Sequence, residues 1–182
     1  SSINGAAMQR GLPEDFDSWA AMGNDQWSYD KVLPFFRKSE HDLDIRDDFH
    51  GTDGPIPVRR RQTGPTPDIQ KAFHAACLDE GYGAVEDTNG PNPAGVGVWP
   101  SNNLDGWRMS AAITHLNPMR HRLNLTVRGG VLARKVLIEN KKAVGVEVES
   151  GGEIFTIEAE RVVLSAGAIK SPHLLMLSGI GP

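Results

Sequence analysis

The residues best suited to contact a ligand are small ones that lie near the two ends of the chain. Near the beginning, Asn4-Gly5-Ala6 places an amide side chain before two residues with minimal side chains. Near the end, Ala166-Gly167 follows the apolar run Val162-Val163-Leu164. Small residues let main-chain atoms approach a ligand closely, because a larger group on Cβ would block the approach. Both segments are candidates for ligand binding, although each one alone also fits an ordinary turn.

The segment around Gly167 has the pattern of a strand, a tight turn and a helix. A strand is expected over residues 161–165, with the turn at Ala166-Gly167. Ser171 is expected to be the N-cap of the helix and Pro172 its first helical residue. The free N–H groups at the beginning of a helix attract phosphate, so nucleotide sites favour this geometry.

Histidine and cysteine do not indicate a metal site or a nucleophile. The six histidines contain neither a pair four residues apart nor an H-x-H spacing, so no metal centre is predicted. The single cysteine, Cys77, is expected in a helix core. Gly95-Val96-Gly97 lacks the third glycine and the helix of a dinucleotide turn. The basic run Arg59-Arg60-Arg61 is interpreted as a solvated strand edge.

Composition predicts a globular domain and argues against several other classes of protein. The 182 residues are 39% hydrophobic and 23% charged, with a formal net charge of −4. A nucleic-acid partner is not expected, because such proteins need a clustered basic face. No apolar run approaches the roughly 18 residues of a membrane span. A single cysteine suits a reducing compartment, so a cytoplasmic location is expected, with membrane association left open.

Besides the helix at Pro172, hydrophobic periodicity and turn residues predict four earlier helices and a β-rich C-terminal third. The third helix should be capped by Thr66 and bury a stripe that includes Ile69 and Phe73. Pro34 should bend the second helix or delay its start, and Pro118 should end the fourth. The expected helices cover residues 13–22, 29–39, 67–81 and 109–116; the expected strands cover residues 56–59, 123–127, 131–139, 143–149, 154–159 and 161–165.

Together these segments resemble the glucose–methanol–choline (GMC) oxidoreductases, flavoenzymes that oxidise alcohols. Residues 166–182 resemble one family signature, and residues 1–19 resemble the end of the other. His50-Gly51, Arg108-Met109-Ser110-Ala111-Ala112 and Asn124-Leu125-Thr126-Val127 follow in the family's order. The resemblance spans essentially the whole chain and is strongest to the choline-dehydrogenase-like branch. Because Ser1 lies inside a motif, an interior fragment of a longer enzyme is expected.

The resemblance implies FAD as the cofactor and supplies candidate residues for binding it. Ser2, Ile3, Asn4, Gly5 and Ala6 would lie against the flavin ring and its ribityl chain. The main chain of Ala133 would receive the adenine, and Ala166 and Gly167 would approach the adenosine or pyrophosphate. Some relatives attach the flavin covalently to a histidine at the position of Ile3, so non-covalent FAD is expected here.

The resemblance also implies a fold, a domain division and a reaction. The expected fold is α/β, and α+β in part: residues 1–39 form a partial FAD-binding segment with lid-type helices, residues 40–122 part of the substrate-binding region, and residues 123–182 a β-meander with a strand, turn and helix. An alcohol would transfer hydride to FAD and an electron acceptor would reoxidise it. The catalytic base is expected beyond Pro182. The alternatives are a hydroxynitrile-lyase-like member and a non-catalytic remnant.

Overall fold

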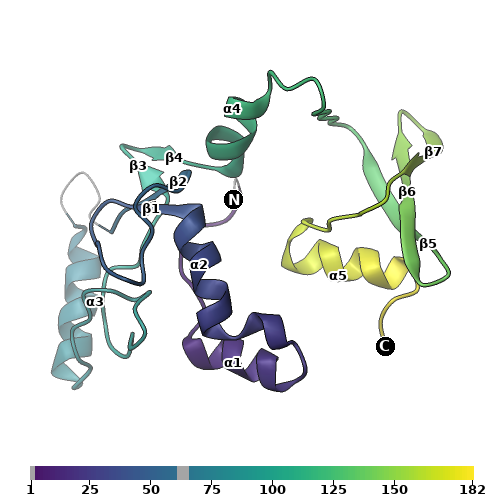
Figure 1. Cartoon of the computed structure of the whole chain (residues 1–182). Helices are drawn as coiled ribbons and strands as arrows, with labels where there is room; N and C mark the ends of the chain where they lie inside the picture. Colours follow the sequence, from purple (N-terminus) through teal and green to yellow (C-terminus); the bar gives the residue numbers. More distant parts are fainter. Residues whose placement is uncertain (1–2, 61–65) are drawn as a thin grey trace. The chain divides into compact units, whose positions relative to one another are not determined.

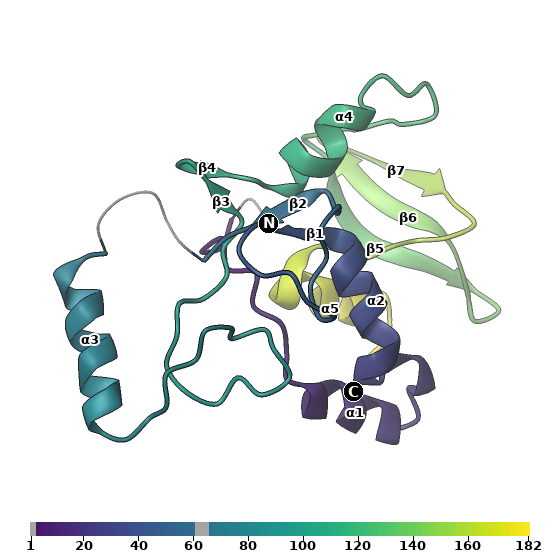
Figure 2. The same cartoon turned by 60° about the vertical axis from the view of Figure 1, so that its left-hand side comes forward.

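The chain divides into two compact units, unit 1 (Ser1–Arg122) and unit 2 (Leu123–Pro182). The computed structural model in Figures 1 and 2 describes residues 3–60 and 66–182. Unit 1 contains most of the helices and two small sheets, whereas unit 2 contains a larger sheet and one helix. The predicted mixture of helix and sheet is therefore confirmed.

Unit 1 begins with two helices that pack through aromatic side chains. Helix α1 (Pro13–Ala21) and helix α2 (Tyr29–Ser39) flank the short 3-10 helix η1 (Asp25–Trp27) and confirm the predicted helices. The buried residues Phe16, Tyr29 and Val32 form the core between them. Pro34 lies inside α2 and does not delay its start.

Two short sheets follow these helices. Strand β1 (Glu40–Asp42) pairs in parallel with β2 (Ile56–Val58), which confirms the predicted extended piece. Strand β3 (Asn103–Leu104) pairs antiparallel with β4 (Trp107–Arg108). The β1–β2 register places Asp42 opposite Val58, and both residues are completely buried.

Helix α3 (Asp68–Asp79) forms where the sequence predicts it, but its apolar face is not buried. Its N-cap is Pro67, so the predicted cap at Thr66 is wrong by one residue. The Ile69 and Phe73 side chains of the predicted stripe are 78% and 66% exposed, and Cys77 is half-buried. Periodicity shows which side chains share a helix face. It does not show whether another element covers that face.

The fourth helical segment continues past the proline that was predicted to end it. A π-helix, η2 (Ala112–Leu116), leads directly into α4 (Asn117–Met119), which contains Pro118. The Asn117 N–H bonds to the carbonyl of Ala112, five residues earlier. In a regular α-helix, the proline ring would clash with the carbonyl four residues before it. We infer that the wider π turn relieves this clash and lets the segment continue.

Unit 2 is a three-stranded meander with one helix packed on it. Strands β5 (Leu132–Glu139), β6 (Lys142–Ser150) and β7 (Glu153–Glu158) are antiparallel in that order, which confirms the predicted meander. Helix α5 (Gly167–Leu177) contacts β5. The buried side chains of this unit are Val136, Val148 and Leu174. Ser178 Oγ accepts a hydrogen bond from the Val136 N–H at 2.8 Å.

Three local predictions for unit 2 are wrong. Residues 123–127 and 161–165 are not strands, and no described residue pairs with them in a ladder. A strand requires a hydrogen-bonding neighbour, which a local pattern does not provide. Helix α5 begins at Gly167, with Ala166 as the N-cap, and not at Pro172. Ser171 lies inside the helix, where its Oγ accepts the Ala166 N–H at 2.9 Å.

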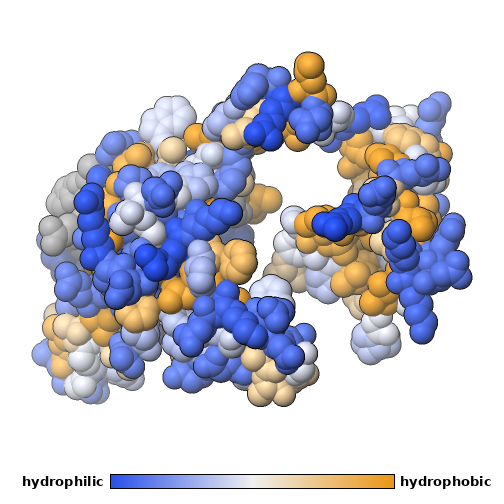
Figure 3. Space-filling view, viewed as in Figure 1, coloured by the Kyte–Doolittle hydropathy of each residue, from blue (hydrophilic) through white to orange (hydrophobic). Residues whose placement is uncertain are grey.

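Both units expose hydrophobic side chains. Figure 3 shows such side chains among the polar ones at the surface. Val163, in the segment predicted as a strand, is 85% exposed, and Trp107 of β4 is also exposed. Within the described ranges, no helix has the length and apolar character required to cross a membrane.

Candidate functional site

The N-terminal turn presents its main chain at the surface of unit 1. Ile3, Asn4 and Gly5 are exposed and Ala6 is partly buried, whereas Ser2 lies outside the described residues. Ala6 has a φ of 61°, in the left-handed region that residues with a Cβ seldom occupy. Such conformations persist only where the surrounding structure holds them, and they occur preferentially at functional sites.

Residues 100–102 hold this turn from one side. The Ala6 carbonyl accepts the Asn102 N–H at 2.9 Å, and the Met8 N–H donates to the Pro100 carbonyl at 2.8 Å. Ala7 and Ser101 form an antiparallel bridge between these bonds. The left-handed Ala6 is therefore fixed by ladder-like hydrogen bonds from a segment far away in sequence.

The chain that leaves this turn enters a buried network of charged residues. The Arg10 guanidinium forms an ion pair with Glu40 and donates to the Phe49 carbonyl at 2.9 Å. Glu40 also accepts the Gly51 N–H at 3.1 Å. Arg10 and Glu40 are both buried, so each charge depends on the other for compensation.

Arg60 forms the second centre of the network. It donates to Asp42 at 2.7 Å and to Asp87 at 2.6 Å, and it lies 3.2 Å from His50 Nε2. Burial lowers the pKa of Arg60, but the hydrogen bonds and charges of the two carboxylates outweigh burial and raise it. With 5% exposure, Arg60 is not the solvated edge residue that the sequence suggests, and Arg61 lies outside the described residues.

The network also gathers Glu40, Asp42 and His50, which the sequence spacing did not reveal. One potential ligand atom from each lies within 4.8 Å of the others. Arg10 pairs with Glu40, and Arg60 pairs with Asp42. Since guanidinium groups already compensate both carboxylates, this arrangement is an internal ion-pair network. The three residues come together through β1 and a turn, which no rule of fixed spacing describes.

His50 links the network to Asp47 near the surface. Its Nδ1 donates to Asp47 Oδ1 at 2.7 Å, and its side chain is fully buried. Burial raises the pKa of Asp47, but hydrogen bonds from the His50 side chain and from the Phe49 and His50 N–H groups outweigh burial. The net effect lowers this pKa below its ordinary value of 3.8.

This shift predicts a small loss of stability in acid. Because the pKa of Asp47 is lower in the folded protein, its contribution is present above pH 3.8 and is lost as pH falls through the folded value. Asp47→Asn should lower the free energy of unfolding at pH 6 by under about 1 kcal/mol, since the carboxylate is partly solvated. Urea denaturation should show a smaller difference in unfolding free energy between the wild type and this variant at pH 3 than at pH 6. An equal difference at both pH values would contradict the assignment, and Asp48→Asn is the control.

In unit 2, Ala133 lies at an irregularity of the sheet. The β5–β6 register shifts between Ala133 and Lys135, so one extra residue of β5 falls between two paired positions. A bulge of this kind leaves the extra residue, here Arg134, outside the ladder. Ala133 itself is paired with Val148, so the contact through its main chain stays a prediction.

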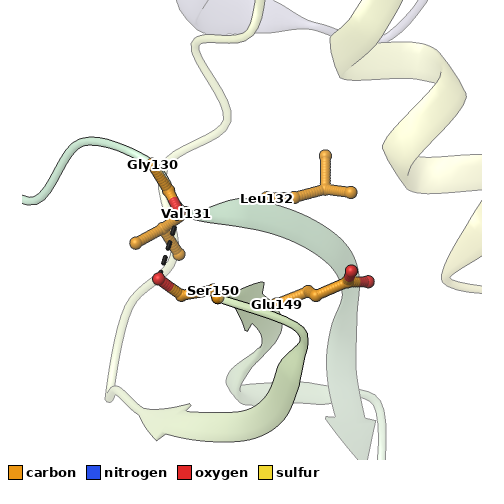
Figure 4. A pocket seen from close by; sticks show the side chains of 6 residues that line it. Gly130, Val131, Leu132, Glu149 and Ser150 are labelled. Carbon is orange, nitrogen blue, oxygen red and sulfur yellow. Dashed lines mark hydrogen bonds between the residues drawn. The ribbon is translucent and has the colours of Figure 1, made fainter.

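A pocket of about 410 Å³ opens beside this bulge. Figure 4 shows the residues that line it at the beginning of β5 and the end of β6, with Ser150 Oγ donating to the Gly130 carbonyl at 3.1 Å. Two glycines, Val131, Leu132 and Ser150 line it together with Glu149, the one charged residue of this lining. Glu149 is paired with Arg134 across the strands.

The predicted bend near the C-terminus has the geometry that glycine allows. Gly167 has a φ of 90°, and no heavy atom lies within 4 Å of the position that a Cβ would occupy. The restriction to glycine therefore comes from backbone conformation and not from crowding within the chain. Ala166 and Gly167 are exposed at the beginning of α5.

The predicted residues thus fall into two groups. Ile3, Asn4, Gly5 and Ala6 form one turn in unit 1, and Ala133, Ala166 and Gly167 belong to unit 2. That the two groups contact a single FAD stays a prediction. The buried network around Arg10 and Arg60 was missed, because its members come from segments that are distant in sequence.

Comparison with protein families gives one match over the whole chain. The family model described as GMC oxidoreductase matches residues 1–182. An uncharacterized GMC-type oxidoreductase of Rhodococcus erythropolis is 42% identical over 181 residues, which are 100% of this chain and 36% of that protein. An oxygen-dependent choline dehydrogenase of Rhizobium etli is 42% identical over 183 residues, 100% of this chain and 33% of the relative.

Solved structures show the same similarity. Pyridoxine 4-oxidase from Mesorbium loti has a TM-score of 0.87 and 34% identity, over 100% of this chain and 36% of its own. An FAD-dependent oxidoreductase from Chaetomium thermophilum has a TM-score of 0.85 and 28% identity, over 99% of this chain and 34% of its own. The chain therefore spans about a third of the length of the relatives that it matches.

Proposed function

The chain belongs to the GMC oxidoreductase family, and from this membership we propose that it is part of an FAD-dependent enzyme that oxidises the CH–OH group of an alcohol. The family match over residues 1–182 carries this proposal. It is supported by the similarity to a choline dehydrogenase and to pyridoxine 4-oxidase. An alcohol and an electron acceptor are the proposed small-molecule partners, with no nucleic acid.

We propose that the candidate residues contact three parts of FAD. The exposed residues Ile3–Gly5, with the Asn4 amide, and the partly buried Ala6 would hold the polar edge of the flavin ring. The main chain of Ala133, next to the bulge in β5, would receive the adenine. The N–H groups at the beginning of α5 would stabilise the pyrophosphate, and Gly167 supplies the backbone conformation for that approach.

The chemistry divides between the cofactor and the protein. FAD, when bound, supplies the acceptor for the hydride that leaves the carbinol carbon. The residues of this chain bind and orient it. Removal of the hydroxyl proton needs a general base, and we assign that role to no residue of this chain. As an isolated polypeptide, the chain is proposed to be inactive.

We expect the FAD to be bound without a covalent link, because an isoleucine side chain cannot form a bond to the flavin. By the resemblance to the family, residue 3, which is Ile3 here, corresponds to the position at which some members attach FAD through histidine. Acid precipitation of the full-length protein should therefore leave the yellow chromophore in the supernatant. Flavin that remained with the precipitate after washing would contradict this prediction.

Anaerobic mixing of the full-length protein with an alcohol tests the proposed reaction. Choline and pyridoxine, which appear in the names of relatives, are the first probes. Loss of the visible absorbance of oxidised flavin is the expected result, and a second step with air or an artificial acceptor should restore it. Flavin that stays oxidised while a hydroxynitrile is cleaved would favour the lyase alternative. A purified protein without flavin would favour the non-catalytic remnant.

The domain roles and cellular location stay predictions. Residues 1–39 and 123–182 are proposed to belong to the FAD-binding domain, and residues 40–122 to the substrate-binding region. The cytoplasm is the proposed location, with membrane association as the alternative. Cell fractionation of the full-length protein distinguishes these two locations.

A further inference from the structure

The Asn89 side chain clamps the segment that follows the predicted flavin-contacting turn. Its Oδ1 accepts the Arg10 N–H at 2.9 Å, and its Nδ2 donates to the Met8 carbonyl at 2.9 Å. Asn89 is buried, and it lies 79 residues from Arg10 in sequence. The amide therefore bonds main-chain groups on both sides of residue 9, as a neighbouring strand would.

From this geometry we propose that Asn89 is a positioning residue, which fixes the Asn4–Ala6 turn in the conformation that receives the flavin. The inference rests on the proposed function, because it assumes that this turn contacts FAD. It adds a role for a residue that acts through the main chain of Met8 and Arg10.

The clamp is itself anchored to the buried charges. The Asn89 N–H donates to Asp87 Oδ1 at 3.0 Å, and the same carboxylate oxygen accepts Arg60 at 2.6 Å. At the surface, Gln9 Nε2 donates to the Thr88 carbonyl at 2.6 Å, and Thr88 Oγ1 donates to Gln9 Oε1 at 3.0 Å. Residues 87–89 thus form a rigid support under residues 8–10.

The support matters because the turn contains a strained residue. Ala6 is left-handed and depends on hydrogen bonds from outside its own segment. Residues 100–102 bind Ala6 and Met8, and Asn89 binds Met8 and Arg10. If Asn89 is removed, one of the two supports is lost, and the main chain at the turn gains freedom. Small displacements of groups that position a reactant produce large losses of rate.

The test compares three variants of the full-length protein. Asn89→Ala removes the hydrogen bonds to Met8 and Arg10. Gln9→Ala removes the exposed hydrogen bonds between Gln9 and Thr88. Asn92→Ala, an exposed asparagine of the same loop, is the matched control. The readouts are hydrogen exchange of the peptide covering residues 3–10 in the apoprotein, the visible circular dichroism of bound flavin, and the rate of flavin reduction at saturating alcohol.

Asn89→Ala is expected to speed exchange in this peptide and to change the flavin dichroism. It should also slow flavin reduction by about tenfold, a barrier increase of about 1.4 kcal/mol. Gln9→Ala should change each readout in the same direction but by less. If Asn89→Ala does not fold, the readouts of Gln9→Ala test the proposal instead. Asn92→Ala should match the wild type.

Two outcomes would overturn the proposal in different ways. If the variants lose thermal stability while flavin dichroism and reduction rate stay at the values of the Asn92→Ala control, Asn89 has only a structural role. The proposed function would be unaffected by that result. If the wild-type protein carries no flavin, the proposed function fails and this inference fails with it.

Discussion

Replacing Arg60 by methionine is expected to lower the free energy of unfolding by about 3–5 kcal/mol. The substitution keeps much of the side-chain volume but leaves Asp42 and Asp87 without their shared cation. Because Asp42 is completely buried, water could not stabilise its charge once the Arg60 guanidinium is gone. Urea denaturation of the full-length protein, followed by tryptophan fluorescence, measures the change.

Two further variants separate charge from geometry. Arg60→Lys keeps the positive charge, but a single ammonium group lacks the planar fork that bridges two carboxylates. It should therefore fall between the wild type and Arg60→Met. Arg59→Met is the matched control, because the Arg59 side chain is 32% exposed and lies 3.9 Å from Asp105. Its effect should stay within about 0.5 kcal/mol. Equal losses for Arg59→Met and Arg60→Met would refute the network's role.

Gly51→Ala is expected to destabilise unit 1 by about 3 kcal/mol through a steric clash. A Cβ at this position would lie 1.8 Å from the Arg37 carbonyl oxygen and 2.7 Å from the Glu40 carbonyl oxygen. Both atoms belong to the main chain, so no side-chain rotation relieves the overlap. The shift would also disturb the Gly51 carbonyl, which accepts the Asp42 N–H at 2.7 Å.

Gly83→Ala provides the control for this prediction. Gly83 also belongs to unit 1, and nothing lies within 4 Å of its Cβ position. Its substitution should leave the melting temperature nearly unchanged or raise it slightly, because alanine reduces the freedom of the unfolded chain. Thermal unfolding of both variants measures the two melting temperatures, and only Gly51→Ala should show a large decrease. Indistinguishable melting temperatures would mean that the packing around Gly51 yields more easily than the structure indicates.

Local chemistry predicted the elements whose signals lie within a few residues. Helix α1 begins at Pro13, has acidic residues in its first turn and ends shortly before Gly23. Each of these signals acts within or next to this one helix. The meander β5–β6–β7 follows from alternating valines and from turns at Asn140-Lys141 and Gly151-Gly152. All four of those turn residues have positive φ.

The wrong predictions concern segments that need a neighbouring strand to pair with, or another element to bury a helix face. Residues 161–165 have a strand's composition, but strand formation needs a neighbour, and no described segment supplies one. Ile69 and Phe73 share a helix face as predicted, yet both are exposed. Ser171 and Pro172 resemble a helix start, but the Ser171 hydroxyl bonds backward to Ala166 inside the helix.

The sequence by itself determined the family, the non-histidine residue at position 3 and the small residues of the proposed flavin contacts. These are properties of residue type and order. Tertiary structure alone decided that Asn89 binds Met8 and Arg10, that Arg60 is buried between two carboxylates, and that Ala6 is left-handed. Hydrogen-bond partners and burial depend on segments that are far apart in the chain, so no local pattern encodes them.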